Sequence, residues 1–277
     1  MKSGNAQMQA QPRHHRGRAA TKLNALLVTS LMLLGFLLAA CGTPTTDRSS
    51  ATGGLCPVAV RQLVDSSVIP DLEVSLVVDG SGSFMGDRPA SDRTASRAFV
   101  AQQVALTVEE AVDKAAALRV IVFGGSAGNA RTVVECPVMA VRYRNEAARA
   151  AKLAHLKQVS RDQVWLAVRN GRPAMAQPGT SVVGGYVALA DATPLTTGRR
   201  EAIMLSDGIA LPEMAVAVDL SAFSSVGMYG LGQTEPPPGT EKVNRLAQSW
   251  HAWLTRQGAR QVVVSTQGHS SKREVAP

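Results

Sequence analysis

The feature that most constrains the fold of this 277-residue chain is an apolar segment that ends in aspartate, glycine and serine. Four of the five residues from Val74 to Val78 are apolar, which is typical of a parallel strand covered on both faces. The run Asp79–Ser83 follows directly and carries one carboxylate and two hydroxyls on a glycine-rich loop. Ligands of open α/β sheets bind at the carboxyl ends of strands, so this loop is a candidate ligand site.

Strands and helices alternate along the rest of the chain. Further strands are expected at 119–123, 131–134 (and 138–141), 201–205, 225–231 and 261–265. Helices are expected from about residue 90 to 117, at 145–156 with a continuation toward 170, at 180–190, and from a Thr240 cap to Gly258. This alternation predicts an α/β fold with a mostly parallel central sheet and helices on both faces.

Two later segments repeat the chemistry of the serine loop. Gly179-Thr180 precedes a helical segment, and Asp207-Gly208 follows an apolar strand. Together with Asp79–Ser83 they resemble the metal-ion-dependent adhesion site of von Willebrand factor A (vWA) domains, which draws on three such segments in this order. The resemblance covers roughly residues 70–266 and implies a three-layer, Rossmann-like vWA fold.

The resemblance also implies a role for each residue of the site. Ser81 and Ser83 would give hydroxyl oxygens to a cation, Thr180 would bind it directly or through water, and Asp79 and Asp207 would act through waters or through hydrogen bonds to the serines. A hard ion such as Mg²⁺ takes about six oxygens, and Mn²⁺ or Ca²⁺ would serve as well. An acidic side chain of a protein partner would complete the shell. The expected function is metal-dependent protein binding and not catalysis.

Two other functions stay open. One is a structural subunit of an envelope complex that uses the same fold without a metal. The other is an α/β-hydrolase, because Gly124–Gly128 fits the G-x-S-x-G pattern of a nucleophile elbow around Ser126. Asp207, followed by His251 or His269, would complete a triad in the right chain order. The residues after Gly128 do not show the helical pattern that an elbow requires.

The N-terminal region is typical of an export signal. Residues 1–22 are basic and polar, and residues 23–40 are almost wholly apolar. Leu38–Cys41 resembles a bacterial lipobox, which implies cleavage before Cys41 and attachment of diacylglycerol to its thiol. An uncleaved membrane anchor is the alternative. Both interpretations place the folded part at the cell membrane on its extracytoplasmic face.

The expected organisation is a lipoprotein signal peptide at 1–40, then a lipidated cysteine, flexible tether and lead-in at 41–69. A vWA domain follows at 70–266, and a disordered tail at 267–277.

The remaining cysteines form an even pair once Cys41 carries lipid. Cys56 and Cys136 would lie in an oxidising compartment, where a disulfide between them is expected. Two buried free thiols are the alternative.

The net charge of +8 does not indicate a nucleic-acid-binding protein. Residues 1–40 hold five of these charges, and the remainder has 24 basic and 21 acidic residues, or +3. Nucleic-acid binding requires a concentrated basic face. Residues 142–172 hold eight basic residues and two acids, which fits a solvated helix face or a partner-docking surface.

Overall fold

The structure is a computed structural model that describes residues 55–85, 94–125, 127–172, 180–209, 216–233 and 238–270. The expected signal peptide, Cys41 and most of the tether lie outside these residues, as does Ser126. Within the described ranges, no helix combines the length and the apolar character needed to cross a membrane.

Six strands form one sheet in the order β3-β2-β1-β4-β5-β6. Neighbouring strands are parallel, except that β3 runs antiparallel to β2 at one edge. The expected α/β fold with a mostly parallel sheet is therefore confirmed. The strands are β1 (Leu72–Asp79), β2 (Ala117–Phe123), β3 (Arg131–Cys136), β4 (Arg199–Leu205), β5 (Ser225–Tyr229) and β6 (Val262–Ser265).

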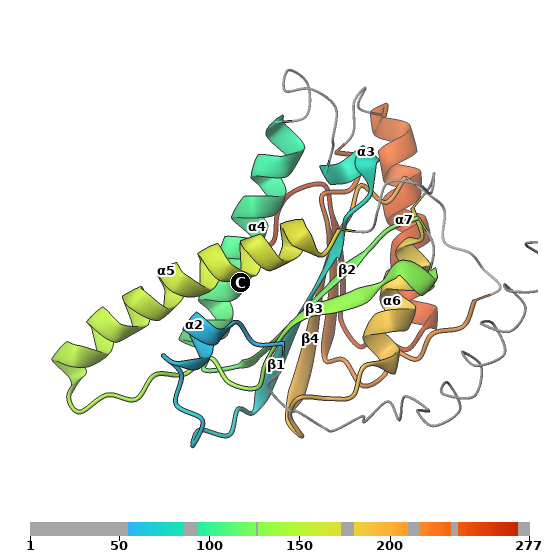
Figure 1. The fold of residues 1–277 in the computed structure, drawn as a ribbon. Coiled ribbons are helices and arrows are strands. Elements are labelled where there is room, and N and C mark those ends of the chain that lie inside the picture. Colours follow the sequence, from blue (N-terminus) through green and yellow to red (C-terminus); the bar gives the residue numbers. More distant parts are fainter. Residues whose placement is uncertain are drawn as a thin grey trace, which may run out of the picture. The chain divides into compact units, whose positions relative to one another are not determined.

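Helices cover both faces of the sheet and give three layers (Figure 1). On one face lie α2 (Val58–Arg61), α4 (Thr94–Asp113) and α5 (Glu146–Asn170). On the other face lie α6 (Val182–Asp191) and α7 (Thr240–Arg256). Two single turns, α3 (Gly82–Met85) and the 3₁₀ turn η1 (Ala127–Asn129), follow the carboxyl ends of β1 and β2.

Strand β1 contributes to both halves of the core. All eight of its residues are buried. Leu76 packs into the cluster under α4 and α5, while Val77 packs into the cluster under α6 and α7. Successive side chains of a strand point to opposite faces, so a strand between two helical layers must be apolar on both. This explains why four of the five residues from Val74 to Val78 are apolar.

Helix α4 ends earlier than its sequence pattern predicts. It stops at Asp113, and Ala115 takes a left-handed backbone conformation with φ of 51°. The amide of Ala116 then donates to the carbonyl of Ala111 at 2.8 Å, which is the hydrogen bond of a Schellman end. Glycine normally fills the left-handed position, and alanine there gives the sequence no sign of a helix end.

Helix α7 corrects one expectation and confirms another. Its N-cap is Gly239, which has no side chain to bond the first turn, and Thr240 is already helical. The expected threonine cap is therefore wrong. Gly258 has φ of 88° and ends the helix as expected. The two tryptophans of its inner stripe, Trp250 and Trp253, are buried in the core.

The chain after β3 does not form the additional strand considered at 138–141. Instead, Met139 donates its amide to Ala116 at 2.8 Å, and Val141 makes a single bridge to Val64. Helix α5 begins at Glu146, where the Asn145 side chain accepts a hydrogen bond from the amide of Ala148 at 2.9 Å. It continues unbroken to Asn170, so the longer version of that helix is the one observed.

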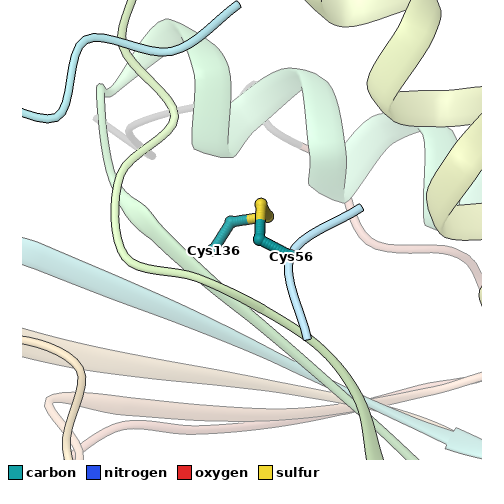
Figure 2. The surroundings of a disulfide bond; sticks show 2 residues. All are labelled: Cys56 and Cys136. Atoms are coloured by element: carbon teal, nitrogen blue, oxygen red, sulfur yellow. A yellow bond between two sulfur atoms is a disulfide. The ribbon is translucent and has the colours of Figure 1, made fainter. Parts of the chain in front are cut away.

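A disulfide joins Cys56 to Cys136, as the cysteine count led us to expect (Figure 2). The two Cα atoms are 4.7 Å apart although the residues are separated by 80 positions. The bond links the lead-in before β1 to the last residue of β3. Since the chain preceding Cys56 contains the expected tether, this bond fixes the entry point of the folded part.

Candidate functional site

The candidate site lies where the direction of strand addition reverses. From β1 the chain adds β2 and β3 on one side, and it then returns to the other side of β1 to add β4, β5 and β6. Doubly wound sheets bind ligands at this switch point, outside the carboxyl ends of the strands. Asp79 is the last residue of β1, and Asp207 comes two residues after the end of β4. The fold therefore places both predicted carboxylates at its preferred binding position.

Asp79 is fully buried and held by hydrogen bonds from two loops. Its Oδ1 accepts from the backbone amide of Ser81 at 2.8 Å, and its Oδ2 accepts from the hydroxyl of Ser206 at 2.8 Å. The Ser206 hydroxyl in turn accepts from the amide of Gly208 at 3.1 Å. These bonds tie the loop after β1 to the loop after β4 and fix the orientation of the carboxylate.

Asp207 is also buried, with 2% of its surface exposed. Its Oδ1 accepts from the amide of Ile209 at 3.2 Å, and its backbone carbonyl accepts from the amide of Gly232 at 2.7 Å. The next carbonyl, that of Gly208, accepts from the indole nitrogen of Trp250 at 3.0 Å. The loop after β4 is therefore braced by the loop after β5 and by α7.

The two carboxylates repel each other in a buried setting. Burial, together with the negative charge of Asp207, raises the pKa of Asp79 to about 7, against the lowering effect of hydrogen bonds from Ser81 and Ser206. Two acids that share a poorly solvated site favour the binding of a proton or a cation between them. The electrostatics of this pair thus suit a positively charged ligand.

The Thr180 turn reaches the same edge of the sheet through β2. The amide of Ser181 donates to the carbonyl of Gly124 at 3.0 Å, and the amide of Gly80 donates to the carbonyl of Phe123 at 2.8 Å. The segments that follow β1 and precede α6 are therefore attached to adjacent residues at the end of β2. Thr180 itself is partly buried in that turn.

The structure brings the three predicted segments to one edge. Ser81 lies next to Asp79 and is 9% exposed, while the backbone of Ser83 belongs to α3 and its side chain lies outside the described residues. In the described part of the chain, no group of three or more His, Cys, Asp or Glu residues is placed to hold a metal. The predicted set has two acids, and its other members are hydroxyls, which suit a hard cation.

Two residues of this region were not predicted from the sequence. Ser206 provides the hydrogen bond to Asp79, and its position directly before Asp207 was the only available sign. Arg172 donates through Nε to the carbonyl of Gly80 at 3.3 Å. It is 92 residues from Gly80, so no local pattern could have indicated that contact.

The histidines of the alternative hydrolase triad have other roles. His269 Nε2 lies 2.6 Å from Glu110 Oε2, and its Nδ1 lies 3.3 Å from the Tyr229 hydroxyl. His251 is exposed on α7. Both ring nitrogens of His269 are thus engaged with α4 and β5. These contacts hold His269, which belongs to the expected tail, against α4 and β5, and residues 271–277 lie outside the described residues.

No protein-family model and no curated protein sequence matches this chain. Among solved structures it is similar to an aerotolerance-related membrane protein from Bacteroides fragilis, at 17% identity and a TM-score of 0.34, over 70% of this chain and 90% of that one. It is similar to a von Willebrand factor type A protein from Catenulispora acidiphila, at 20% identity and a TM-score of 0.34, over 71% of this chain and 38% of that one. It is also similar to the PilB minor pilin from Streptococcus sanguinis, at 12% identity and a TM-score of 0.37, over 73% of this chain and 58% of that one. Identities this low assign no role to any side chain.

Proposed function

We propose that this chain is a lipid-anchored, extracytoplasmic interaction module that binds a protein partner through a divalent cation, Mg²⁺ or else Mn²⁺ or Ca²⁺. The observation that carries the proposal is the pair of buried carboxylates, Asp79 and Asp207, at the switch point of the sheet. Their mutual repulsion favours a cation, and the neighbouring hydroxyl residues Ser81, Ser83 and Thr180 are ligands suited to a hard one.

The hydrogen bonds of the site fit a mixed coordination shell. Each carboxylate oxygen of Asp79 already accepts a hydrogen bond from a neighbouring loop. Asp79 would therefore act by orienting bound waters and the serine hydroxyls, as supporting groups do at other metal sites. Neutral hydroxyl ligands leave part of the ion's charge available for an incoming carboxylate.

Arg172 supports an acidic partner. Its guanidinium reaches the carbonyl of Gly80 in the middle of the serine loop, so a fixed positive charge stands beside the site. A cation next to a binding site favours the approach and capture of a negative group. An aspartate or glutamate of the partner is the ligand that best combines these features.

Two observations support an extracytoplasmic location. Leu38–Cys41 matches a lipobox and would give an N-terminal lipid at Cys41. The disulfide between Cys56 and Cys136 belongs to a class of bond that persists in oxidising compartments and is rare in the cytosol. The lipid would attach the module to the membrane surface.

Calorimetric titration of Mg²⁺ and Mn²⁺ into the full-length chain tests the metal site. We expect saturable binding by the native chain and loss of binding in Asp207→Asn. Asp219→Asn is the matched control, because Asp219 is an exposed aspartate that accepts a hydrogen bond from Ser221 in an ordinary turn. The absence of metal binding by the native chain, or equal binding by Asp207→Asn, would reject the proposal.

A crosslinked pull-down from native envelopes tests the partner interaction. We expect chelator and Asp207→Asn each to abolish capture, and Asp219→Asn to leave it unchanged. Capture that survives both treatments would instead identify the chain as a structural subunit that uses no metal.

A further inference from the structure

We propose a second binding site, for a phosphate group, at the amino edge of the sheet. A pocket of about 500 Å³ opens there, beside the starts of β1, β4, β5 and β6. Its polar lining includes Asp71, Arg199, Arg200, Ser224 and Arg260. This edge is opposite to the one that carries Asp79 and Asp207.

Arg200 is the central residue of this pocket. Its side chain is 7% exposed, and its guanidinium carbon lies 4.2 Å from the centre of the Phe223 ring. Two of its nitrogens, Nε and Nη2, are buried and make no hydrogen bond within the described part of the chain. Buried polar groups are normally satisfied, so the positive charge of Arg200 is compensated only in part by the described part of the chain.

The acid nearest to Arg200 does not compensate it fully. Glu73 Oε2 is 3.5 Å from the Nε of Arg200, but it also accepts from the amide of Leu195 at 2.8 Å. The other oxygen of Glu73 accepts from Arg119 at 2.8 Å. Burial lowers the pKa of Arg200, although the charge of Glu73 acts in the opposite direction. An additional anion would stabilise the charged form of Arg200.

The charges around the pocket match a phosphate. Arg199 and Arg260 are exposed at its wall, and together with Arg200 and the exposed Asp71 they give a local charge of three cations less one acid, or +2. A phosphate monoester carries about −1.5 to −2 at neutral pH. Planar guanidinium groups bind phosphate oxygens in pairs, which favours phosphate over a halide.

The size of the pocket favours a phosphate with an organic substituent. Small-molecule sites are commonly about 300–1,000 Å³, and this volume exceeds what a bare phosphate fills. Arg200 also lines a second pocket of about 230 Å³, but that one contains Asp191 and Asp219, which would repel an anion. The pocket with Arg199 and Arg260 is therefore the one that fits.

Phosphate titration at constant ionic strength, with chloride as the balancing anion, tests the site in the full-length chain. We expect saturable binding that the double variant Arg199→Ala/Arg260→Ala weakens roughly tenfold or more, since two charge-assisted contacts are lost. Arg245→Ala is the matched control, because Arg245 is an exposed arginine paired with Glu241 on α7. Asp71→Asn should tighten binding, a gain that a folding defect cannot imitate.

The proposal is overturned if phosphate does not bind, if the double variant binds as the native chain does, or if Arg245→Ala weakens binding equally. Glycerol phosphate, titrated in parallel, distinguishes the sources of the ligand. Tighter binding of glycerol phosphate would indicate a phosphoester such as a lipid headgroup, and equal binding would indicate that free phosphate is sufficient. Chelator and Asp207→Asn should leave phosphate binding unchanged, which separates this site from the metal site.

Discussion

The two edges of the sheet bury charge in opposite ways. At the amino edge, Glu73 and Arg119 are 0% and 1% exposed and form an ion pair at 2.8 Å, and Arg119 also pairs with Glu135 at 3.1 Å. At the carboxyl edge, Asp79 and Asp207 are equally buried but carry the same sign of charge. The opposite charges of Glu73 and Arg119 join strands to one another, whereas the like charges of Asp79 and Asp207 favour a bound cation.

The comparison shows why buried charge alone does not identify a functional site. Removing one member of a buried pair is strongly destabilising, because the remaining charge is left without compensation. Removing one of two like charges relieves repulsion instead. The sign of the stability change on mutation therefore distinguishes a buried pair of charges that stabilises the fold from a buried pair that favours a ligand.

The largest effect is expected from Arg119→Met. This change leaves Glu73 buried and without its closest cation, so we expect a loss of about 3–5 kcal/mol in the free energy of unfolding. Urea denaturation followed by circular dichroism measures it. Arg245→Met serves as the exposed control, and a loss below about 1 kcal/mol for Arg119→Met would contradict the contrast between the edges.

The next largest effect is a pH dependence of the metal-free chain. The folded pKa of Asp79 is about 7 against an ordinary value of 3.8, so the folded state holds a proton that the unfolded state has released. In chelator, stability should therefore fall as pH rises from about 4 to about 7, by up to about 4 kcal/mol. Denaturation curves across this range measure the slope.

Asp207→Asn should reduce that slope without abolishing it, because burial, the larger cause of the raised pKa of Asp79, remains when the neighbouring charge is removed. Mg²⁺ should restore the stability of the native chain above pH 7. A native chain whose stability is the same in chelator at pH 5 and pH 8 would rule out the repulsion between the two acids.

A smaller effect of opposite sign is expected from Glu110. Burial raises its pKa, but hydrogen bonds from His269 and Lys114 outweigh burial and lower the pKa to about 2. Stability contributed by Glu110 is thus present above about pH 4.5 and is lost as pH falls toward 2. Glu110→Gln should remove this loss of stability at low pH. We expect the loss to be about 1 kcal/mol, because solvent partly screens the interaction of Glu110 with Lys114. If Glu110→Gln loses as much stability between pH 4.5 and pH 2 as the native chain does, the contact of Glu110 with His269 and Lys114 does not have this role.

The smallest effect is expected from Glu241→Gln. Glu241 pairs with Arg245 at 3.2 Å, as Glu73 pairs with Arg119, but the two side chains are 85% and 69% exposed. Exposed pairs contribute little, so stability should change by less than about 0.5 kcal/mol. Comparison with Arg119→Met under the same conditions isolates the contribution of burial. A change above about 1 kcal/mol would mean that exposure does not explain the difference.

The sequence was most informative where one short segment contains both a strand and the functional residues at its end. The buried run before Asp79 predicts a central parallel strand, and the acids at the ends of two strands must meet once those strands are adjacent. That is why the fold class and the edge that carries Asp79, Thr180 and Asp207 could be predicted. Whether these residues hold a metal stays a prediction.

Long-range contacts and unusual backbone conformations could not be predicted. The contact between Arg172 and Gly80, and the network around Glu73, depend on residues that only the finished fold brings together. The end of α4 depends on Ala115 in a conformation that glycine usually takes. In each case the structure depends on a contact or a backbone conformation that a local sequence pattern does not indicate.

The disulfide has a mechanical consequence if the chain is anchored through Cys41 as proposed. A pull that enters the chain before Cys56 passes through the sulfur atoms to Cys136, so it does not run along the backbone between these two cysteines, which are 80 positions apart. The segment between them contains β1, β2 and the residues Asp79 and Ser81. Force applied to the tether therefore cannot unfold β1 and β2 from the N-terminal side. The site would keep its partner bound under forces that unfold a chain without the disulfide.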